Sequence, residues 1–147
     1  MSRFFFLLIF VLLGHLVNAQ VISAEPEFPT RDQGLTITFY AKNGNGALEG
    51  YTDDIYAHTG VLTSLSTSPT DWRYVKAGWE ENIEATKLTR IAEDTLQLEI
   101  TPAIDDFYGV PEGEVIEKLA FVFRNADGSI VGRAADGGDI FYDVFQE

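Results

Sequence analysis

Apolar and polar residues alternate in several short runs, and this period of two constrains the fold more than any other feature of the chain. In residues 35–40 and 96–100 every second side chain is Leu, Ile or Phe, so a strand formed there can bury one face. Further strands are predicted at residues 21–24, 54–59, 72–77, 87–91, 119–124 and 140–144. Turn-forming runs separate them at residues 43–46, 93–94, 125–128 and 136–139.

Helical periodicity is nearly absent, and only residues 104–108 predict a helical turn. Seven or eight short strands punctuated by Gly and Pro predict an all-β fold, an immunoglobulin-like antiparallel β-sandwich. A jelly roll is the alternative, because the number of strands does not fix the order in which they pair. In residues 118–144 two alternating runs flank a connection rich in Gly and Asp, which predicts a hairpin at the end of the sandwich.

The N-terminal segment has the pattern of a secretory signal peptide. Arg3 supplies a positive charge, an unbroken apolar run follows at residues 4–13, and small residues lead up to Ala19. The apolar run is too short to span a bilayer comfortably. We therefore expect a signal peptide at residues 1–19, cleaved from a single β-sandwich domain at residues 20–147 that is secreted or periplasmic.

Composition narrows the function classes. The chain has no Cys, so it can form no disulfide and carry no thiol nucleophile. With only His15 and His58 it cannot build a histidine metal cluster. The enzymatic alternatives are a serine triad on His58 and a glycosidase that uses paired carboxylates such as Asp105 and Asp106. The 23 acidic residues against 10 Lys and Arg give a net charge of −13, which repels nucleic acid and anionic membranes. We expect a monomeric, non-catalytic protein without cofactor or metal.

The aromatic residues after the predicted strand at 54–59 are candidates for sugar binding. A sugar ring has apolar C–H faces and a rim of hydroxyls, so proteins stack exposed aromatic rings on the face and hydrogen-bond the rim. Trp72 and Tyr74 share one face of a regular strand, and Trp79 follows in a loop. His58 lies on the preceding strand, opposite its apolar face. Exposed indoles would form a flat platform for a saccharide, whereas burial of one tryptophan in the core is the competing expectation.

Several segments resemble a known family. Residues 56–60 read Tyr-Ala-His-Thr-Gly, an aromatic-rich segment follows at 72–79, and residues 121–128 and 136–144 form the predicted closing hairpin. These features resemble the starch-binding modules of carbohydrate-binding module families 25 and 26. Nearly all of the mature chain resembles the amino-terminal sandwich domain of secreted Bacteroidetes α-amylase-like proteins. The resemblance implies amylase-associated binding of α-glucan, either starch or a maltooligosaccharide. The contact residues that it implies are His58, Trp72, Tyr74 and Trp79.

The final hairpin differs from that family, because many of its modules carry a tryptophan in this loop and residues 130–136 contain no aromatic side chain. The alternative function is a structural or protein-interaction immunoglobulin-like domain without a sugar site, including a fragment of a longer amylase. This alternative predicts that both tryptophans are buried. Four residues of the hairpin carry side-chain oxygens that could bind a calcium ion or form the hydrogen bonds of ordinary turns. They are Asn125, Asp127, Asp136 and Asp139.

Overall fold

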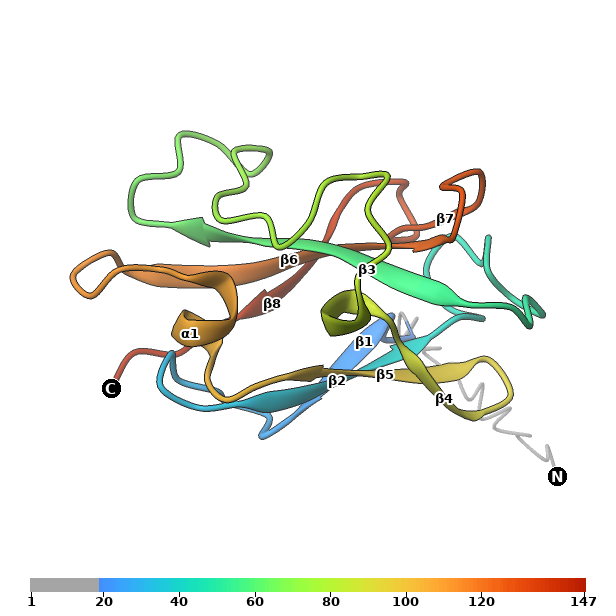
Figure 1. Cartoon of the computed structure of the whole chain (residues 1–147), viewed down its shortest axis with the longest axis horizontal. Helices are drawn as coiled ribbons and strands as arrows, with labels where there is room; N and C mark the ends of the chain where they lie inside the picture. The colour runs from blue at the N-terminus through green and yellow to red at the C-terminus, as the bar shows by residue number, and fades with distance from the viewer. Residues whose placement is uncertain (1–18) are drawn as a thin grey trace, which may run out of the picture.

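The computed structural model describes residues 19–147, which form two antiparallel four-stranded β-sheets packed face to face (Figure 1). The first sheet has the order β1 (Ile22–Glu25), β2 (Leu35–Tyr40), β5 (Thr95–Ile100) and β4 (Thr89–Ala92). The second contains β3 (Ile55–Thr63), β6 (Ile116–Asn125), β7 (Val131–Gly132) and β8 (Ile140–Asp143). The prediction of an all-β sandwich is confirmed, whereas nearly all of the predicted signal peptide lies outside the described residues.

The pairing order distinguishes the two sandwich alternatives. Strand β6 pairs with β3 along one edge and with β7 and β8 along the other. The strands lie side by side in the order β1, β2, β5, β4 in one sheet. In the other sheet β3 is followed by β6, and then by β7 and β8. This is the strand order of a constant-type immunoglobulin domain, with its last strand divided into β7 and β8. The pairing therefore supports the immunoglobulin-like interpretation over the jelly roll.

The predicted core faces are buried as the period of two requires. In β2 the buried residues Leu35, Ile37 and Phe39 alternate with partly exposed ones. Phe39 stacks on Phe123 of the opposite sheet at 4.1 Å between ring centroids. The helical turn α1 (Ile104–Tyr108), predicted correctly, adds buried side chains to the same core. Each inward side chain of this size contributes about 1.5–3 kcal/mol by leaving water.

The strand predicted at residues 72–77 is wrong, because the chain turns there instead of extending. Tyr74 has a φ of +51°, a left-handed conformation that a strand cannot accommodate. Arg73 forms only an isolated bridge with Val61. The strand predicted at residues 87–91 begins later, as β4, and the two-residue β7 was not predicted.

The long connection between β3 and β4 positions the candidate site. It arches over the outer side of the second sheet and contains one short 3-10 turn, η1 (Glu84–Thr86) (Figure 1). Backbone hydrogen bonds fasten it to the free edge of β3: Lys76 N–H donates to Thr59 O at 2.9 Å, and Leu88 N–H donates to Ile55 O at 2.9 Å. The connection therefore covers part of a sheet face that would otherwise be exposed.

Candidate functional site

His58 is the centre of the candidate site. It lies in β3 on the outer face of the second sheet, opposite Val122 of β6 in the strand register. The ring of Trp72 stacks near it, with centroids 5.7 Å apart and planes 29° apart. The ring of Trp79 meets it edge-on, with centroids 5.1 Å apart and planes 77° apart. The structure thus brings together three of the four predicted contact residues.

Neither indole belongs to the hydrophobic core. The side chain of Trp79 is 36% exposed and Trp72 is partly exposed. The two indole planes cannot be parallel, because one is nearly parallel to the imidazole and the other nearly perpendicular. The expectation of a flat platform is therefore wrong, and the rings form an angled surface. The two buried tryptophans that the structural-domain alternative predicts are not observed.

Arg124 and Gly128 both lie against the ring of Trp79. The Arg124 guanidinium lies 5.6 Å from the Trp79 ring and 5.5 Å from the ring of Tyr56, a distance at which cation–π attraction is effective. Gly128, in the turn between β6 and β7, lies so close to the indole that a β-carbon there would be 2.8 Å from Trp79 Nε1. The turn therefore requires glycine for this ring to occupy its place.

Arg124 also fixes the backbone that follows Trp79. Its Nη2 donates to Glu81 O at 2.9 Å, and its Nη1 donates to Asn82 Oδ1 at 2.8 Å and to Asn125 O at 3.0 Å. The side chain is 2% exposed, and its Nε has no hydrogen-bond partner among the described residues. A buried cation bound mainly by carbonyl oxygens is costly to disturb, because each oxygen would lose its donor. Arg124 therefore positions Trp79 through both ring and backbone contacts.

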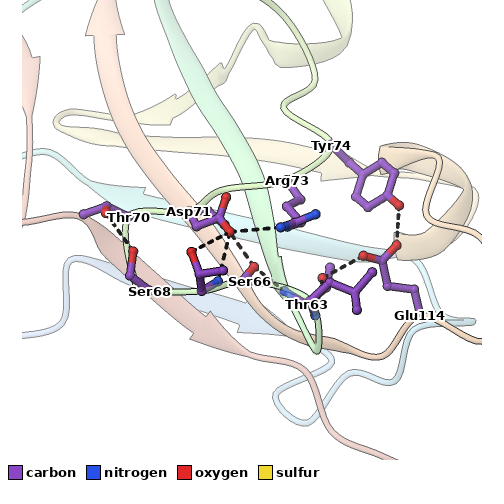
Figure 2. Close-up of polar contacts among 10 residues, drawn as sticks. Thr63, Ser66, Ser68, Thr70, Asp71, Arg73, Tyr74 and Glu114 are labelled. Carbon is purple, nitrogen blue, oxygen red and sulfur yellow. Dashed lines mark hydrogen bonds and ion pairs between the residues drawn. The ribbon is translucent and has the colours of Figure 1, made fainter.

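Polar contacts at the end of β3 fix the chain before Trp72, as Figure 2 shows. Asp71 Oδ2 accepts a hydrogen bond from the backbone N–H of Thr67 at 2.9 Å, and Asp71 O accepts one from Ser66 Oγ at 2.9 Å. Ser66 Oγ in turn accepts from the backbone N–H of Thr63, the last residue of β3, at 3.0 Å. The Thr67 bond contributes most to lowering the pKa of Asp71. Trp72 is thus attached to a segment tied to the sheet.

Tyr74 lies outside the depression that contains His58, so the structure does not bring this predicted contact to the site. Its hydroxyl donates to Glu114 Oε2, and Glu114 Oε1 accepts from Thr63 Oγ1 at 2.8 Å (Figure 2). The Tyr74 hydrogen bond contributes most to lowering the pKa of Glu114. The Tyr74 ring packs partly buried against the core. Tyr74 therefore anchors the connection.

An open depression of about 270 Å³ lies at the three aromatic rings. Besides these rings, its lining residues are Thr70, Val122, Arg133 and Asp139. Arg133 Nη1 and Asp139 Oδ1 form an ion pair at 3.3 Å. Neither residue was predictable as part of the site, because nothing in a Gly- and Asp-rich turn shows which side chains reach the strand bearing His58. The depression offers apolar rings on one side and charged hydrogen-bonding groups on another.

The surroundings of His58 favour the neutral form of its imidazole. Burial lowers the pKa of its imidazole below the ordinary value of 6.5, the positive charge of Arg124 lowers it further, and the negative charge of Asp139 acts in the opposite direction. Among the described residues, no hydrogen bond contributes to this shift. A neutral imidazole has one donor and one acceptor nitrogen, so it can bond either way to a ligand hydroxyl.

A second depression, of about 690 Å³, lies beside the edge strand β4. Five of its eleven lining residues are charged: Asp54, Glu84, Lys87, Arg90 and Glu99. No aromatic ring lines it, so it lacks the stacking surface that a sugar face requires.

The four oxygen-bearing residues of the closing hairpin serve turn and ion-pair chemistry. Asp127 Oδ1 accepts from the backbone N–H of Ser129 at 3.0 Å, and Asp136 Oδ1 accepts from that of Gly138 at 2.8 Å. Asn125 Oδ1 accepts from the backbone N–H of Ile130 at 3.0 Å, and Asp139 forms an ion pair with Arg133. Within residues 19–147 no group of three or more His, Cys, Asp or Glu is arranged to hold a metal ion.

Comparison of the sequence with models of known protein families and with curated proteins found no match. The resemblance to starch-binding modules therefore stays a prediction. In the part of the chain that the structure describes, no helix has the length and apolar character needed to cross a membrane.

Proposed function

We propose that this protein is a secreted, non-catalytic carbohydrate-binding module that holds α-glucan near an amylase. The observation that carries the proposal is the grouping of His58, Trp72 and Trp79 in one open depression on the outer face of the second sheet. Partly exposed indoles beside a neutral imidazole offer a stacking surface and a hydrogen-bonding group together. This combination matches the apolar face and the hydroxyl rim of a sugar ring.

The angle between the indoles favours an α-glucan over a flat, extended polysaccharide. Successive glucose rings of an α-1,4-linked chain tilt relative to one another, because the chain curves into a helix. Two rings that differ in orientation, Trp72 and Trp79, can therefore each stack on a different sugar ring. Arg124 and Asp71 hold these indoles before ligand arrives, which reduces the entropy lost on binding.

Isothermal titration against maltoheptaose, together with a starch pull-down, tests the proposal. We expect binding by the wild type, weakened about tenfold or more, which corresponds to ~1.4 kcal/mol, in Trp72→Ala and in Trp79→Ala. Binding should persist in moderate salt, because stacking and neutral hydrogen bonds are screened little. Phe28→Ala is the matched control, since Phe28 is an aromatic residue with 65% exposure outside the depression. Absence of wild-type binding, or binding as tight as that of the wild type in both tryptophan variants, would contradict the proposal.

One observation favours the protein-interaction alternative. Phe28 and Phe145 form an exposed edge-to-face pair with centroids 5.2 Å apart, at 65% and 39% exposure. If this pair is a self-association surface, the wild type should elute as a dimer in size-exclusion chromatography and Phe28→Asp as a monomer. The sugar-module proposal predicts a monomer for both.

A further inference from the structure

Arg133 and Asp139 form one polar wall of the depression that contains His58 and the two indoles. Arg133 follows β7 and Asp139 precedes β8, so the two residues stand at the two ends of the loop between these strands. The depression therefore combines a charged pair from this loop with the aromatic rings of His58, Trp72 and Trp79.

Backbone hydrogen bonds hold the loop in shape. Ala134 N–H donates to Gly138 O at 3.0 Å and closes the loop next to both charged residues. Arg133 is fixed further by Asn45, because Arg133 N–H donates to Asn45 Oδ1 at 3.1 Å and Asn45 N–H donates to Arg133 O at 2.9 Å. The backbone that carries the charged pair is thus in place before any ligand binds, which favours affinity.

The ion pair occupies only part of each charged group. Arg133 Nη1 lies 3.3 Å from Asp139 Oδ1, and within residues 19–147 no protein group hydrogen-bonds Asp139 Oδ2 or Arg133 Nη2. The side chains of Arg133 and Asp139 are 37% and 22% exposed. The pair therefore presents an unused acceptor and an unused donor beside an aromatic surface.

Two neighbouring hydroxyls on a sugar ring complement such a pair. One hydroxyl donates to the carboxylate, while the adjacent hydroxyl accepts from the guanidinium, and both hydrogen bonds are strengthened by charge. In an α-1,4-linked glucose residue the 2- and 3-hydroxyls are adjacent and free, because the linkage uses the oxygen on carbon 4. An α-1,3 linkage occupies the oxygen on carbon 3 and removes one member of the pair from every residue except the one at the non-reducing end.

Building on the proposed function, we propose that Arg133 and Asp139 bind the 2,3-diol of a glucose residue whose ring face stacks on Trp72 or Trp79. These two charged residues then determine which glucan linkages the site accepts. The rings supply affinity for any sugar face, while the ion pair distinguishes sugars by the position of their free hydroxyls.

Isothermal titration with maltoheptaose and with an α-1,3-linked glucose oligosaccharide of the same length tests this inference. The wild type should bind maltoheptaose at least about tenfold more tightly than the α-1,3-linked oligosaccharide. Asp139→Ala and Arg133→Ala should each weaken maltoheptaose binding by about tenfold and bring the two affinities together. Asp143→Ala is the matched control, because it removes an exposed ion pair, with Lys118 at 2.5 Å, on the same edge of the sheet but outside the depression. It should bind as the wild type does.

The outcomes separate this inference from the proposed function. If the wild type binds maltoheptaose, and Asp139→Ala and Arg133→Ala change its affinity by less than twofold, the diol assignment is overturned while the sugar site stands. If the wild type binds no oligosaccharide, the proposed function fails and the diol assignment fails with it. Circular dichroism and thermal unfolding report whether each variant is folded. Asp139→Asn, which preserves side-chain shape, replaces Asp139→Ala if that variant does not fold, and the same twofold limit applies to it.

Discussion

Replacing Gly128 with alanine should move Trp79 without removing any group that could contact a ligand. A β-carbon at this position would lie 2.8 Å from Trp79 Nε1 and 3.3 Å from Cε2. Ordinary contact begins near 3.5 Å, so the indole must retreat by about 0.7 Å or the turn must shift by a similar distance. Either response changes the distance between Trp79 and the imidazole of His58, now 5.1 Å between centroids.

Two costs follow from this substitution, and they can be measured separately. Gly128 has a φ of +74°, a conformation that costs alanine about 1–2 kcal/mol, which should appear as a loss of unfolding free energy. An aromatic stacking contact is worth about 0.5–1.5 kcal/mol, so a misplaced Trp79 should raise the Kd for maltoheptaose about two- to twelvefold.

Gly50→Ala is the matched control for the backbone cost. Gly50 has the same φ of +74°, and no atom lies within 4 Å of the position of its β-carbon. Urea unfolding should show similar losses of stability for both variants, whereas titration calorimetry should show weakened maltoheptaose binding for Gly128→Ala alone. Wild-type affinity in Gly128→Ala, or an equal loss of affinity in Gly50→Ala, would refute the role assigned to this close approach.

Three further predictions concern Arg124, His58, and the carboxylates of Asp71 and Glu114. Arg124→Leu should reduce the unfolding free energy by about 2–4 kcal/mol in urea titrations, because several buried carbonyls lose their donor, and should also increase acrylamide quenching of Trp79. Because the folded-state pKa of His58 is below its ordinary 6.5, the unfolded chain takes up its proton first, so stability should fall as pH drops below about 6.5; His58→Gln should lose this step in pH-dependent thermal melts. The lowered pKa values of Asp71 and Glu114 should make stability fall again as pH drops below their ordinary values of 3.8 and 4.5, and Asp71→Asn should reduce that second fall.

Strands whose inward side chains alternate were predictable, because burial of one sheet face leaves a pattern within each strand. Ile37 and Phe39 illustrate this: both are buried where the period of two places them. His58 was predictable for the same reason, since the apolar residues that flank it fix which face of β3 it occupies. The order in which the strands pair was not predictable, because it depends on contacts between strands far apart in the sequence.

The connection that carries the tryptophans follows tertiary contacts instead of a local period. Tyr74 lies outside the depression that Trp72 lines, and its hydroxyl bonds to Glu114, forty residues later in the chain. Arg133 and Asp139 reach the rings only because β7 and β8 both pair with β6. Such placements leave no signal in a single sequence. Neither the position of Tyr74 nor the charged pair was therefore predictable, whereas His58, Trp72 and Trp79 do lie together.

The most direct test of the account is a ¹⁵N-labelled NMR titration of the protein with maltoheptaose. The chain contains two tryptophans, Trp72 and Trp79, so its two indole N–H resonances report on the proposed surface without ambiguity. Both indole resonances should shift and reach saturation together with the amide signals of residues around His58. Indole resonances that stay fixed at saturating maltoheptaose would contradict it, as would shifts confined to the region around Phe28 and Phe145.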